Sequence, residues 1–440
     1  MGEGIIYICV LEFRIILIQI YNFHIFQFTH YQMLPDIYYF NPTCEPAIAN
    51  GSPYYTAPAL LRKFESDLGY LPGWLGEEKD QVLIQGAVDL EFESKMKDMG
   101  FNLPEFRDLG KALSDPEWVS RSKSHLRPWG WSPAVYQLFK NVLPTCCDDF
   151  LQSQVANWLP EHKNLYSRLT AIGLLENAIR NCPESWLTGR MELPVVCSTL
   201  EEIHNRLNQH EKAVVKSPWS SSGRGLLLFP NVDSRKKNDE LLSGMLNQQG
   251  FVTVEPWLDR VKDLSFQFLS QAGKISFMGS TFFETDRKGK YIRTFMTDIP
   301  GLQVGISEFL KEHYREIVEL LGQALSQSGY ATLYEGWIGV DTMIYKSDGG
   351  ELKFHPMVEI NGRYTMGAVA MKIREHLVQG SHGSMQIFYS KTDNFESFCR
   401  KEEAERTLVM NGQKIVSGFL PLTPPLPEHH FGAYVEVSSD

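Results

Sequence analysis

Two polar residues in the segment His355-Pro-Met-Val-Glu-Ile-Asn-Gly-Arg363 have the types and the spacing of a metal site. Glu359 and Asn361 stand two residues apart in a segment that we predict to be a β-strand, so their side chains point to the same face. A carboxylate and an amide carbonyl would then direct oxygen ligands to one point, which suits Mg²⁺ bound together with nucleotide phosphates. Arg363 adds a fork-shaped guanidinium that can bind a phosphate or a carboxylate.

A loop of small residues at 220–225 lies between two apolar segments, 213–215 and 226–229, that we predict to be β-strands. Small residues let backbone N–H groups approach phosphate oxygens closely, and Lys216 supplies a positive charge at the end of the first strand. The loop is not of the Walker A type, because no Gly-Lys-Ser/Thr sequence stands before a helix. A strand follows it instead, so we predict a hairpin that covers phosphates.

Two more segments complete a set of four between about residues 205 and 370. The third is Phe251-Val-Thr-Val-Glu-Pro-Trp-Leu258, with Lys262-Asp-Leu-Ser-Phe-Gln-Phe268 after it. The fourth is Gly339-Val-Asp341, which precedes the segment that contains Glu359. One such segment alone is a weak signal, but the four in this order resemble the ATP-grasp superfamily of carboxylate–amine and carboxylate–thiol ligases.

The resemblance implies a role for each of these residues. In ATP-grasp enzymes the loop and its lysine bind phosphates, a strand that ends in Glu-x-x-Leu lines the adenine pocket, and an acidic residue opening the next strand binds the ribose. Arg363 and Lys216 are the expected catalytic residues, with Arg363 on the acyl-phosphate or the transferring phosphoryl group. The other matching residues are Lys216, Ser220, Ser221, Ser222 and Gly223 for phosphates, Glu255, Trp257 and Leu258 for adenine, Asp263 for ribose, and Asp341, Glu359 and Asn361 for the metal.

A second phosphate-binding lysine is common in the family, and its position is less clear in this sequence. Arg168 and Arg190 are the candidates, and each departs from the usual lysine. Both precede the small-residue loop in the chain, so the sequence leaves the choice between them open.

Each of these features also has a structural interpretation. A Glu-Ile-Asn sequence on a strand is often a solvated edge, and a Ser/Gly loop between strands is often a plain hairpin. Trp257 and Leu258 could equally be core residues. The twelve histidines show no metalloprotease spacing, and we interpret His355, on the same strand face as Glu359, as a neutral structural histidine.

Composition sets the broad class of the protein. The chain has 440 residues and a net charge of −11, with 43% hydrophobic and 22% charged residues. This length predicts two or three domains, and the negative charge argues against a nucleic-acid partner. The seven cysteines form no Cys-x-x-Cys pair, which is typical of reduced thiols in a cytoplasmic protein.

The first 32 residues differ from the rest of the chain. Residues 5–28 are rich in Ile, Phe and Tyr, but Glu12 and Arg14 interrupt them, and charged residues within a membrane span are costly. The segment also lacks a basic n-region and a small-residue cleavage site. We interpret residues 1–32 as a mis-called start, with the true chain beginning at Met33 and no membrane partner. An uncleaved membrane anchor and a genuine folded extension are the alternatives.

The first part of the chain predicts a fold of the α/β (α+β) class. Strands expected at 37–40 and 80–84 alternate with helices expected at 58–68 and 94–99, which predicts a small layer with parallel strands. A polar loop is expected from residue 45 to about residue 56. The resemblance implies a pre-ATP-grasp α/β domain at 33–150, a helical linker at 151–205, and then a two-lobed ATP-grasp fold, with the small lobe at 206–290 and the large lobe at 291–440 carrying the metal site and a C-terminal surface strap.

The chemistry that the resemblance implies is ATP-dependent activation of a carboxylate as an acylphosphate, followed by attack of an amine, with ADP formed. ATP and Mg²⁺ (or Mn²⁺) are the expected cofactors, a small-molecule or peptide carboxylate and an amine are the expected substrates, and the oligomeric state is open. Phosphoryl transfer depends mostly on positioning and electrostatics, so no Ser/His/Asp nucleophile is required. The alternatives are an ATP-grasp kinase that phosphorylates a hydroxyl, and a nucleotide-binding protein without ligase turnover.

Overall fold

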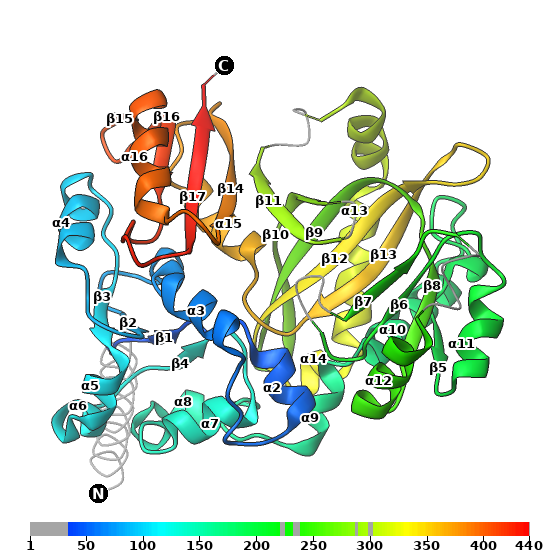
Figure 1. Cartoon of the computed structure of the whole chain (residues 1–440), viewed down its shortest axis with the longest axis horizontal. Coiled ribbons are helices and arrows are strands. Elements are labelled where there is room, and N and C mark those ends of the chain that lie inside the picture. The colour runs from blue at the N-terminus through cyan, green and yellow to red at the C-terminus, as the bar shows by residue number, and fades with distance from the viewer. Residues whose placement is uncertain (1–33, 221–224, 232–237, 287–288, 298–301, 440) are drawn as a thin grey trace, which may run out of the picture.

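The computed structural model describes residues 34–220, 225–231, 238–286, 289–297 and 302–439, and these residues form three β-sheets with helices packed around them (Figure 1). One sheet is parallel and two are antiparallel, so the fold is of the mixed α/β class that the sequence predicts. Residues 1–32, and with them the prediction about the start of the chain, lie outside the described residues. Within the described ranges, no helix is both long and apolar enough to cross a membrane.

The first sheet has the strand order β3-β2-β1-β4, and its paired strands are all parallel, as predicted. Strand β1 is buried throughout, which is typical of a parallel strand covered on both faces. The elements of this region are β1 (Ile37–Tyr39), β2 (Gln81–Ile84), β3 (Glu105–Asp108) and β4 (Leu126–Pro128), the helices α2 (Cys44–Asn50), α3 (Ala59–Asp67), α4 (Leu90–Asp98), α5 (Leu109–Ser114), α6 (Pro116–Ser120), α7 (Pro133–Phe139) and α8 (Asp148–Leu151), and the 3₁₀-helices η1 (Leu71–Trp74) and η2 (Leu143–Thr145).

Helix α2 occupies part of the polar loop that we predicted at 45–56, so that prediction is wrong for its first half. Ala47 and Ile48 are buried, and this burial stabilises a helix that the local sequence does not predict. Pro46 is tolerated because it lies in the first helical turn, where backbone N–H groups have no helical partner. Gly51 ends the helix with a left-handed backbone conformation (φ 78°).

The second sheet is small and antiparallel, with the strand order β5-β8-β6-β7. Strands β6 and β7 pair as the hairpin predicted around the small-residue loop. Val215 and Val254 lie in a core with Ile203 and Leu242, so the alternate residues of β6 and β8 face the other way. The elements of this region are α9 (Pro160–Leu165), α10 (Arg168–Asn181), η3 (Arg190–Glu192), β5 (Val195–Cys197), α11 (Leu200–Leu207), β6 (Ala213–Lys216), β7 (Leu226–Phe229), α12 (Asp239–Gln249) and β8 (Val252–Pro256).

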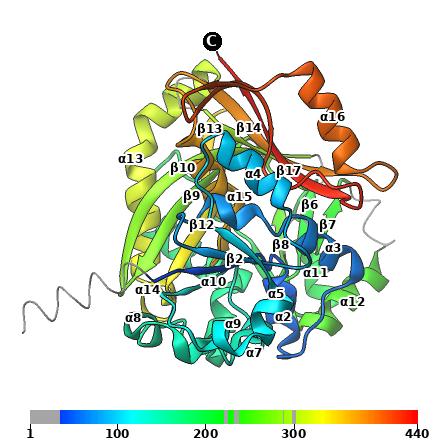
Figure 2. The same ribbon diagram turned by 90° about the vertical axis from the view of Figure 1, so that its left-hand side faces the viewer.

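The third sheet has nine strands among the described residues, in the order β13-β12-β9-β10-β11-β14-β17-β16-β15, and every pairing is antiparallel. Its β12–β13 end lies beside the small sheet, and the long helix α13 runs alongside β9 and β10 (Figures 1 and 2). The elements are β9 (Asp259–Gln271), β10 (Lys274–Thr285), β11 (Tyr291–Met296), α13 (Val304–Ser326), α14 (Gly329–Thr332), β12 (Gly336–Lys346), β13 (Leu352–Asn361), α15 (Met366–Arg374), β14 (His382–Tyr389), α16 (Phe395–Glu405), β15 (Val409–Asn411), β16 (Lys414–Pro421) and β17 (Phe431–Ser438).

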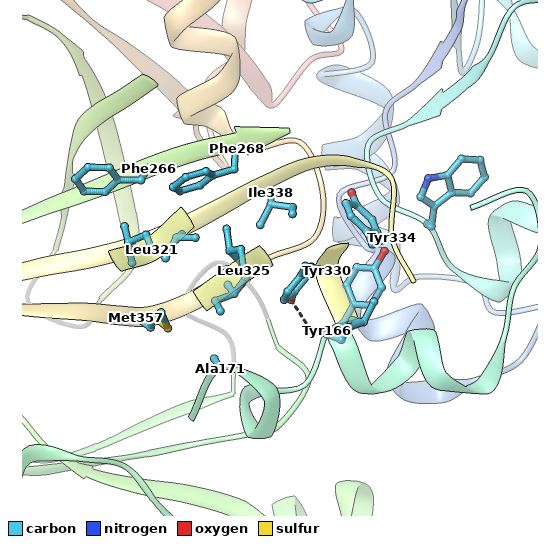
Figure 3. Close-up of a cluster of buried hydrophobic side chains, with 14 of the residues drawn as sticks. Tyr166, Ala171, Phe266, Phe268, Leu321, Leu325, Tyr330, Tyr334, Ile338 and Met357 are labelled. Atoms are coloured by element: carbon cyan, nitrogen blue, oxygen red, sulfur yellow. Dashed lines mark hydrogen bonds between the residues drawn. The ribbon is translucent and has the colours of Figure 1, made fainter. Parts of the chain in front are cut away.

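One face of the β9–β12–β13 region is part of the main hydrophobic core. Phe266 and Phe268 of β9 and Ile338 of β12 lie in the same buried cluster as Leu321 and Leu325 of α13 (Figure 3). Because successive side chains of a strand point to opposite faces, the residues between these apolar ones lie on the other side of the sheet. That second face carries the polar residues described below.

The C-terminal tail is not the surface strap that we predicted. Strand β17 pairs with β14, and β16 pairs with β17, so the tail extends the nine-stranded sheet. Within the proline cluster at 421–427, Leu422 and Thr423 are fully buried. The alternation of Ala433, Val435 and Val437 is what buries one face of β17.

Strand pairing also bears on the expected extent of the small lobe, residues 206–290. Strand β5 of the small sheet begins before this range, at Val195. Strands β9 and β10 fall inside the range but pair with β12 and β11 of the nine-stranded sheet. The small sheet therefore occupies residues 195–256.

Candidate functional site: a carboxylate pair linked by Arg168 to a loop of small residues

Asp341 and Glu359 lie directly opposite each other on the neighbouring strands β12 and β13. Asn361, two residues beyond Glu359, donates a hydrogen bond from Nδ2 to Asp341 Oδ2 at 3.1 Å. The three residues that we expected to bind a metal therefore meet at one place. This place is on the face of the nine-stranded sheet that points away from the α13 core, because Ile338 and Val340 occupy the core face of β12.

The Asp341 carboxyl group is held in a fixed position and carries a perturbed pKa. Ser265 Oγ on β9 donates a hydrogen bond to Asp341 Oδ1 at 2.7 Å. Burial, together with the negative charge of Glu359, raises the pKa of Asp341 to about 7, although Ser265, Arg363 and Asn361 act in the opposite direction. Two carboxyl groups in one buried site favour protonation of one of them, and a bound cation would remove that preference.

Arg363 is anchored between the metal strand and the first sheet. Its Nη2 donates to Asn361 Oδ1 at 2.9 Å, and its Nε forms an ion pair with Glu45 of α2. Both side chains are mostly buried, with exposed fractions of 13% for Arg363 and 7% for Glu45. The backbone of Arg363 also forms an isolated bridge with Gly130, just after β4. The guanidinium that we expected on a transferring phosphoryl group therefore has a protein carboxylate as its partner here.

Lys216 and Glu255 form an ion pair on the small sheet. Their neighbours Val215 and Val254 point into the small core, so Lys216 and Glu255 lie on the opposite face of this sheet. The exposed fractions are only 8% and 14%, which means that the pair is shielded from most of the solvent. One residue expected to bind phosphate and one expected to line the adenine pocket are thus brought into direct contact.

Arg168, the first residue of α10, joins the small-residue loop to the metal strand. Its Nη2 donates to Glu359 Oε1 at 2.8 Å and to Ser220 Oγ at 3.4 Å, and its Nε donates to Ser217 O at 3.0 Å. Arg190, the other candidate for the second phosphate-binding position, is exposed in η3. Of the two, Arg168 is the one that the structure places beside the loop.

The loop itself is described only at its two ends. Ser220 Oγ donates to Ser217 O at 3.4 Å, and Gly225 closes the loop with a positive φ of 68°. A Cβ atom at Gly225 would lie 2.9 Å from Ser220 Cβ, so this position requires glycine. Ser221, Ser222 and Gly223, three of the expected phosphate-binding residues, lie outside the described residues.

The remaining expected residues lie near the start of β9. Trp257 and Leu258 are partly buried in the connection from β8, and Trp257 N donates to Lys212 O at 3.0 Å. Asp263 is buried, and burial raises its pKa even though its carboxylate forms an ion pair with Arg260 at 3.1 Å. It pairs with Met343, two residues beyond Asp341 on β12, so Asp263 shares the polar face of the sheet.

Three polar residues of this region were not assigned from the sequence. Gln267 Nε2 donates to Ser265 Oγ at 2.8 Å, which extends the polar face from Asp341 and Ser265 along β9 to the neighbouring row of Gly339. The alternation Asp-Leu-Ser-Phe-Gln-Phe at 263–268 could have identified Ser265 and Gln267, because it places their side chains on the same face of the strand as Asp263. Glu45 had no such signal, since its partner Arg363 is 318 residues away in the chain.

The donor set fits a hard divalent cation such as Mg²⁺. Two carboxylates and one amide oxygen are ligands of the kind that Mg²⁺ binds. The Asn361 oxygen has two lone pairs, so it can accept from Arg363 and still offer a second lone pair to a cation. Among the described residues, no group of three or more His, Cys, Asp and Glu side chains is placed to hold a metal. The candidate site has only two such side chains, Asp341 and Glu359, and its third ligand would be the amide oxygen of Asn361.

Comparisons with known proteins give similarity of overall arrangement only. No protein-family model matches the sequence, and a search of curated proteins finds no match. Among solved structures, the chain is similar to N5-carboxyaminoimidazole synthetase from Staphylococcus aureus complexed with ADP, with 13% identity, a TM-score of 0.47, and coverage of 92% of this chain and 94% of that one.

Two further solved structures give similar values. One is the biotin carboxylase domain of the Hydrogenobacter thermophilus 2-oxoglutarate carboxylase in complex with MgADP, ADP and bicarbonate, with 11% identity, a TM-score of 0.45, and coverage of 92% of this chain and 86% of that one. The other is N5-carboxyaminoimidazole ribonucleotide synthetase from Thermus thermophilus, with 12% identity, a TM-score of 0.45, and coverage of 91% of this chain and 93% of that one. Identities and TM-scores this low transfer neither a site residue nor an activity to this chain.

Proposed function

We propose that this protein is an ADP-forming ligase of the ATP-grasp type, which activates a carboxylate as an acylphosphate and joins it to an amine. The observation that supports this most directly is the set of contacts made by Arg168. One guanidinium bonds the small-residue loop, through Ser217 and Ser220, and the metal strand, through Glu359. A loop suited to phosphates and a carboxylate pair suited to Mg²⁺ thus lie on the two sides of one cation, as binding of a metal–triphosphate requires.

Each side chain has a task in this proposal. Lys216 and Arg168 would bind phosphate oxygens, Lys216 as a point charge and Arg168 through its planar fork. Asp341, Glu359 and Asn361 would hold Mg²⁺, which when bound neutralises charge on the β- and γ-phosphates. Arg363, oriented by Glu45, would stabilise negative charge that develops on the transferred phosphoryl group.

Nucleotide binding would replace part of two ion pairs that the site already contains. Lys216 is paired with Glu255, and Arg168 is paired with Glu359, so both cations already have carboxylate partners. In the proposed complex, phosphate oxygens would replace the carboxylates as partners of Lys216 and Arg168, and Glu359 would bind the metal instead. Neither cation then moves from water into the protein when the nucleotide binds, which limits the desolvation cost of binding.

Thermal unfolding with Mg·ATP and with EDTA·ATP tests the nucleotide and metal assignment. A ligand that binds only the folded state raises the melting temperature, so we expect a clear shift with Mg·ATP and a smaller one with EDTA·ATP. The double variant Asp341→Asn/Glu359→Gln should lose the difference between the two conditions. Asp348→Asn, at an exposed aspartate in the turn between β12 and β13, is the matched control and should keep it.

Product analysis then separates a ligase from the alternatives. Amino acids and short peptides are screened for those that stimulate ADP release, and free phosphate is measured beside ADP. A ligase releases ADP and phosphate in equal amounts, whereas a kinase forms ADP and a phosphoester without free phosphate. If Mg·ATP binds but no substrate mixture stimulates turnover, the ligase assignment is contradicted and nucleotide binding alone remains.

A further inference from the structure

His355 is a buried imidazole with an unused nitrogen. Its side chain lies on β13 and the residue is only 4% exposed, yet its Nδ1 has no hydrogen-bond partner. Buried polar groups in proteins are nearly always hydrogen-bonded, so each exception calls for an explanation. We interpreted this residue from the sequence as a neutral structural histidine, but a structural histidine would be expected to have both nitrogens satisfied or exposed.

Strand pairing places His355 next to the candidate metal site. Strand pairing forms adjacent rows across β9, β12 and β13: Ser265 with Asp341 and Glu359, and then Asp263 with Met343 and His355. These two rows are two residues apart on β9 and β12, or roughly 7 Å, and four residues apart on β13, where the strand register shifts. His355 therefore lies on the same face as the carboxylate pair and one row away from it, in the row that contains the expected ribose-binding residue.

The charged neighbours of His355 belong to the small sheet. The charges that act on its imidazole come from Glu255 and Lys216, both on the small sheet. The imidazole thus faces the ion pair that we assign to the nucleotide site, although it belongs to the nine-stranded sheet. A nucleotide bound between the sheets, with its phosphates at the Asp341 row, would bring its nucleoside part to the row of His355.

The imidazole is also neutral, which restricts the kind of group that it can recognise. Burial lowers the pKa of His355 to about 4, with Glu255 and Lys216 acting in opposite directions. A neutral imidazole has one nitrogen that donates and one that accepts, and it offers no charge to a phosphate. Its natural partners are the neutral donors and acceptors of a nucleobase or a ribose.

We propose that His355 binds the nucleoside part of the nucleotide through Nδ1, and so determines which nucleotide the site accepts. From the sequence we interpreted His355 as a neutral structural histidine. The proposal keeps the neutral imidazole but replaces the purely structural role with a contact to the ligand. This inference rests on the nucleotide binding proposed above. It adds a residue outside the expected adenine and ribose sets.

Two variants of His355 and one control test this proposal. His355→Phe keeps the ring shape and removes both nitrogens, and His355→Asn keeps a polar group near the position of Nδ1. His376→Phe is the control, because His376 is a partly buried imidazole packed against Trp74 and Phe101, away from the small sheet. Titration calorimetry measures Kd for Mg·ATP, Mg·GTP and Mg·2′-deoxyATP, and thermal unfolding measures the stability of each protein without nucleotide.

We expect His355→Phe to weaken Mg·ATP binding about tenfold, equal to about 1.4 kcal/mol, and His355→Asn to recover part of this loss. Unfolding without nucleotide should be unchanged or shifted upward in His355→Phe, since an unpaired polar group is removed. If the contact is with the base, the preference between ATP and GTP falls in His355→Phe. If the contact is with the ribose, the preference for ATP over 2′-deoxyATP falls instead.

Equal affinities of wild type and His355→Phe for all three nucleotides would overturn the proposal, as would an equal loss of affinity in His376→Phe. A lower melting temperature of His355→Phe with unchanged Kd would also overturn it, by showing a structural role. A wild-type protein that binds no nucleotide would overturn both this proposal and the proposed function. A wild type that binds normally, beside a His355→Phe variant that binds equally well, overturns this proposal alone.

Discussion

Replacement of Arg168 by methionine is the sharpest test of how the two sides of the site are joined. Methionine keeps most of the apolar stem and removes three hydrogen bonds at once, to Ser217 O, Ser220 Oγ and Glu359 Oε1. It also leaves Glu359 opposite Asp341 without its closest positive partner. We therefore expect both the stability of the free protein and its affinity for Mg·ATP to fall.

The size of the stability loss follows from the burial of the pair. Removing one partner of a fully buried ion pair costs about 3–5 kcal/mol. Arg168 is 11% exposed but Glu359 is 25% exposed, so water can solvate part of the carboxylate that remains. The bonds to Ser217 and Ser220 are to neutral acceptors, and one of them is long, so each adds about 0.5–1 kcal/mol or less. We expect the free energy of unfolding to decrease by about 2–3 kcal/mol.

Urea unfolding and calorimetric titration with Mg·ATP measure the two effects separately. Arg190→Met is the matched control, because Arg190 is the other sequence candidate and lies exposed in η3. We expect Arg168→Met to weaken Mg·ATP binding by at least about tenfold, as loss of a charge-assisted contact to phosphate implies, and Arg190→Met to change neither quantity. Nucleotide affinity at the wild-type level in Arg168→Met would refute the reasoning, even if stability falls, because Arg168 would then be structural only.

Three further outcomes are expected. Glu359→Gln should lower kcat by about 100-fold or more with the fold intact, because the metal loses an anionic ligand where the γ-phosphate must be neutralised; wild-type kcat with any productive substrate would contradict the metal assignment. Lys216→Ala should instead raise KM for ATP by about tenfold, since its charge meets phosphates in the ground state as well, and an unchanged KM would argue that Lys216 serves only to pair with Glu255. The pKa of Asp36 lies well below its ordinary value of 3.8, because the hydrogen bond with His125 and the charge of Arg127 outweigh burial, which acts to raise it. Its stabilising effect is therefore complete above about pH 5 and is lost as the pH falls through 3.8 toward the lower folded value. The gap of about 1–2 kcal/mol in unfolding free energy between wild type and Asp36→Asn should therefore stay constant down to about pH 5 and narrow between about pH 5 and about pH 3, and a gap that widens in this range would contradict the assignment.

Several parts of the fold were predictable because their signals are local. The hairpin of β6 and β7 follows from two apolar runs around a loop of small residues, and the parallel first sheet follows from alternating strands and helices. The shared face of Glu359 and Asn361 follows from their two-residue spacing on a strand. Helix α2 and the burial of β17 were missed, because packing against distant elements stabilises them more than the local sequence does.

The sequence alone determined which residues carry suitable chemistry and which face of its own strand each occupies, since these depend on residue type and on the period of the strand. Only the tertiary structure decided their partners. Arg168 meets Glu359 across 191 residues, and Glu45 meets Arg363 across 318 residues. Such pairs form because separate sheets pack together, and no periodicity within either segment encodes the contact. The placement of Arg168, and not Arg190, beside the small-residue loop, and the unpaired nitrogen of His355 near Lys216, therefore became visible only once the sheets were placed in space.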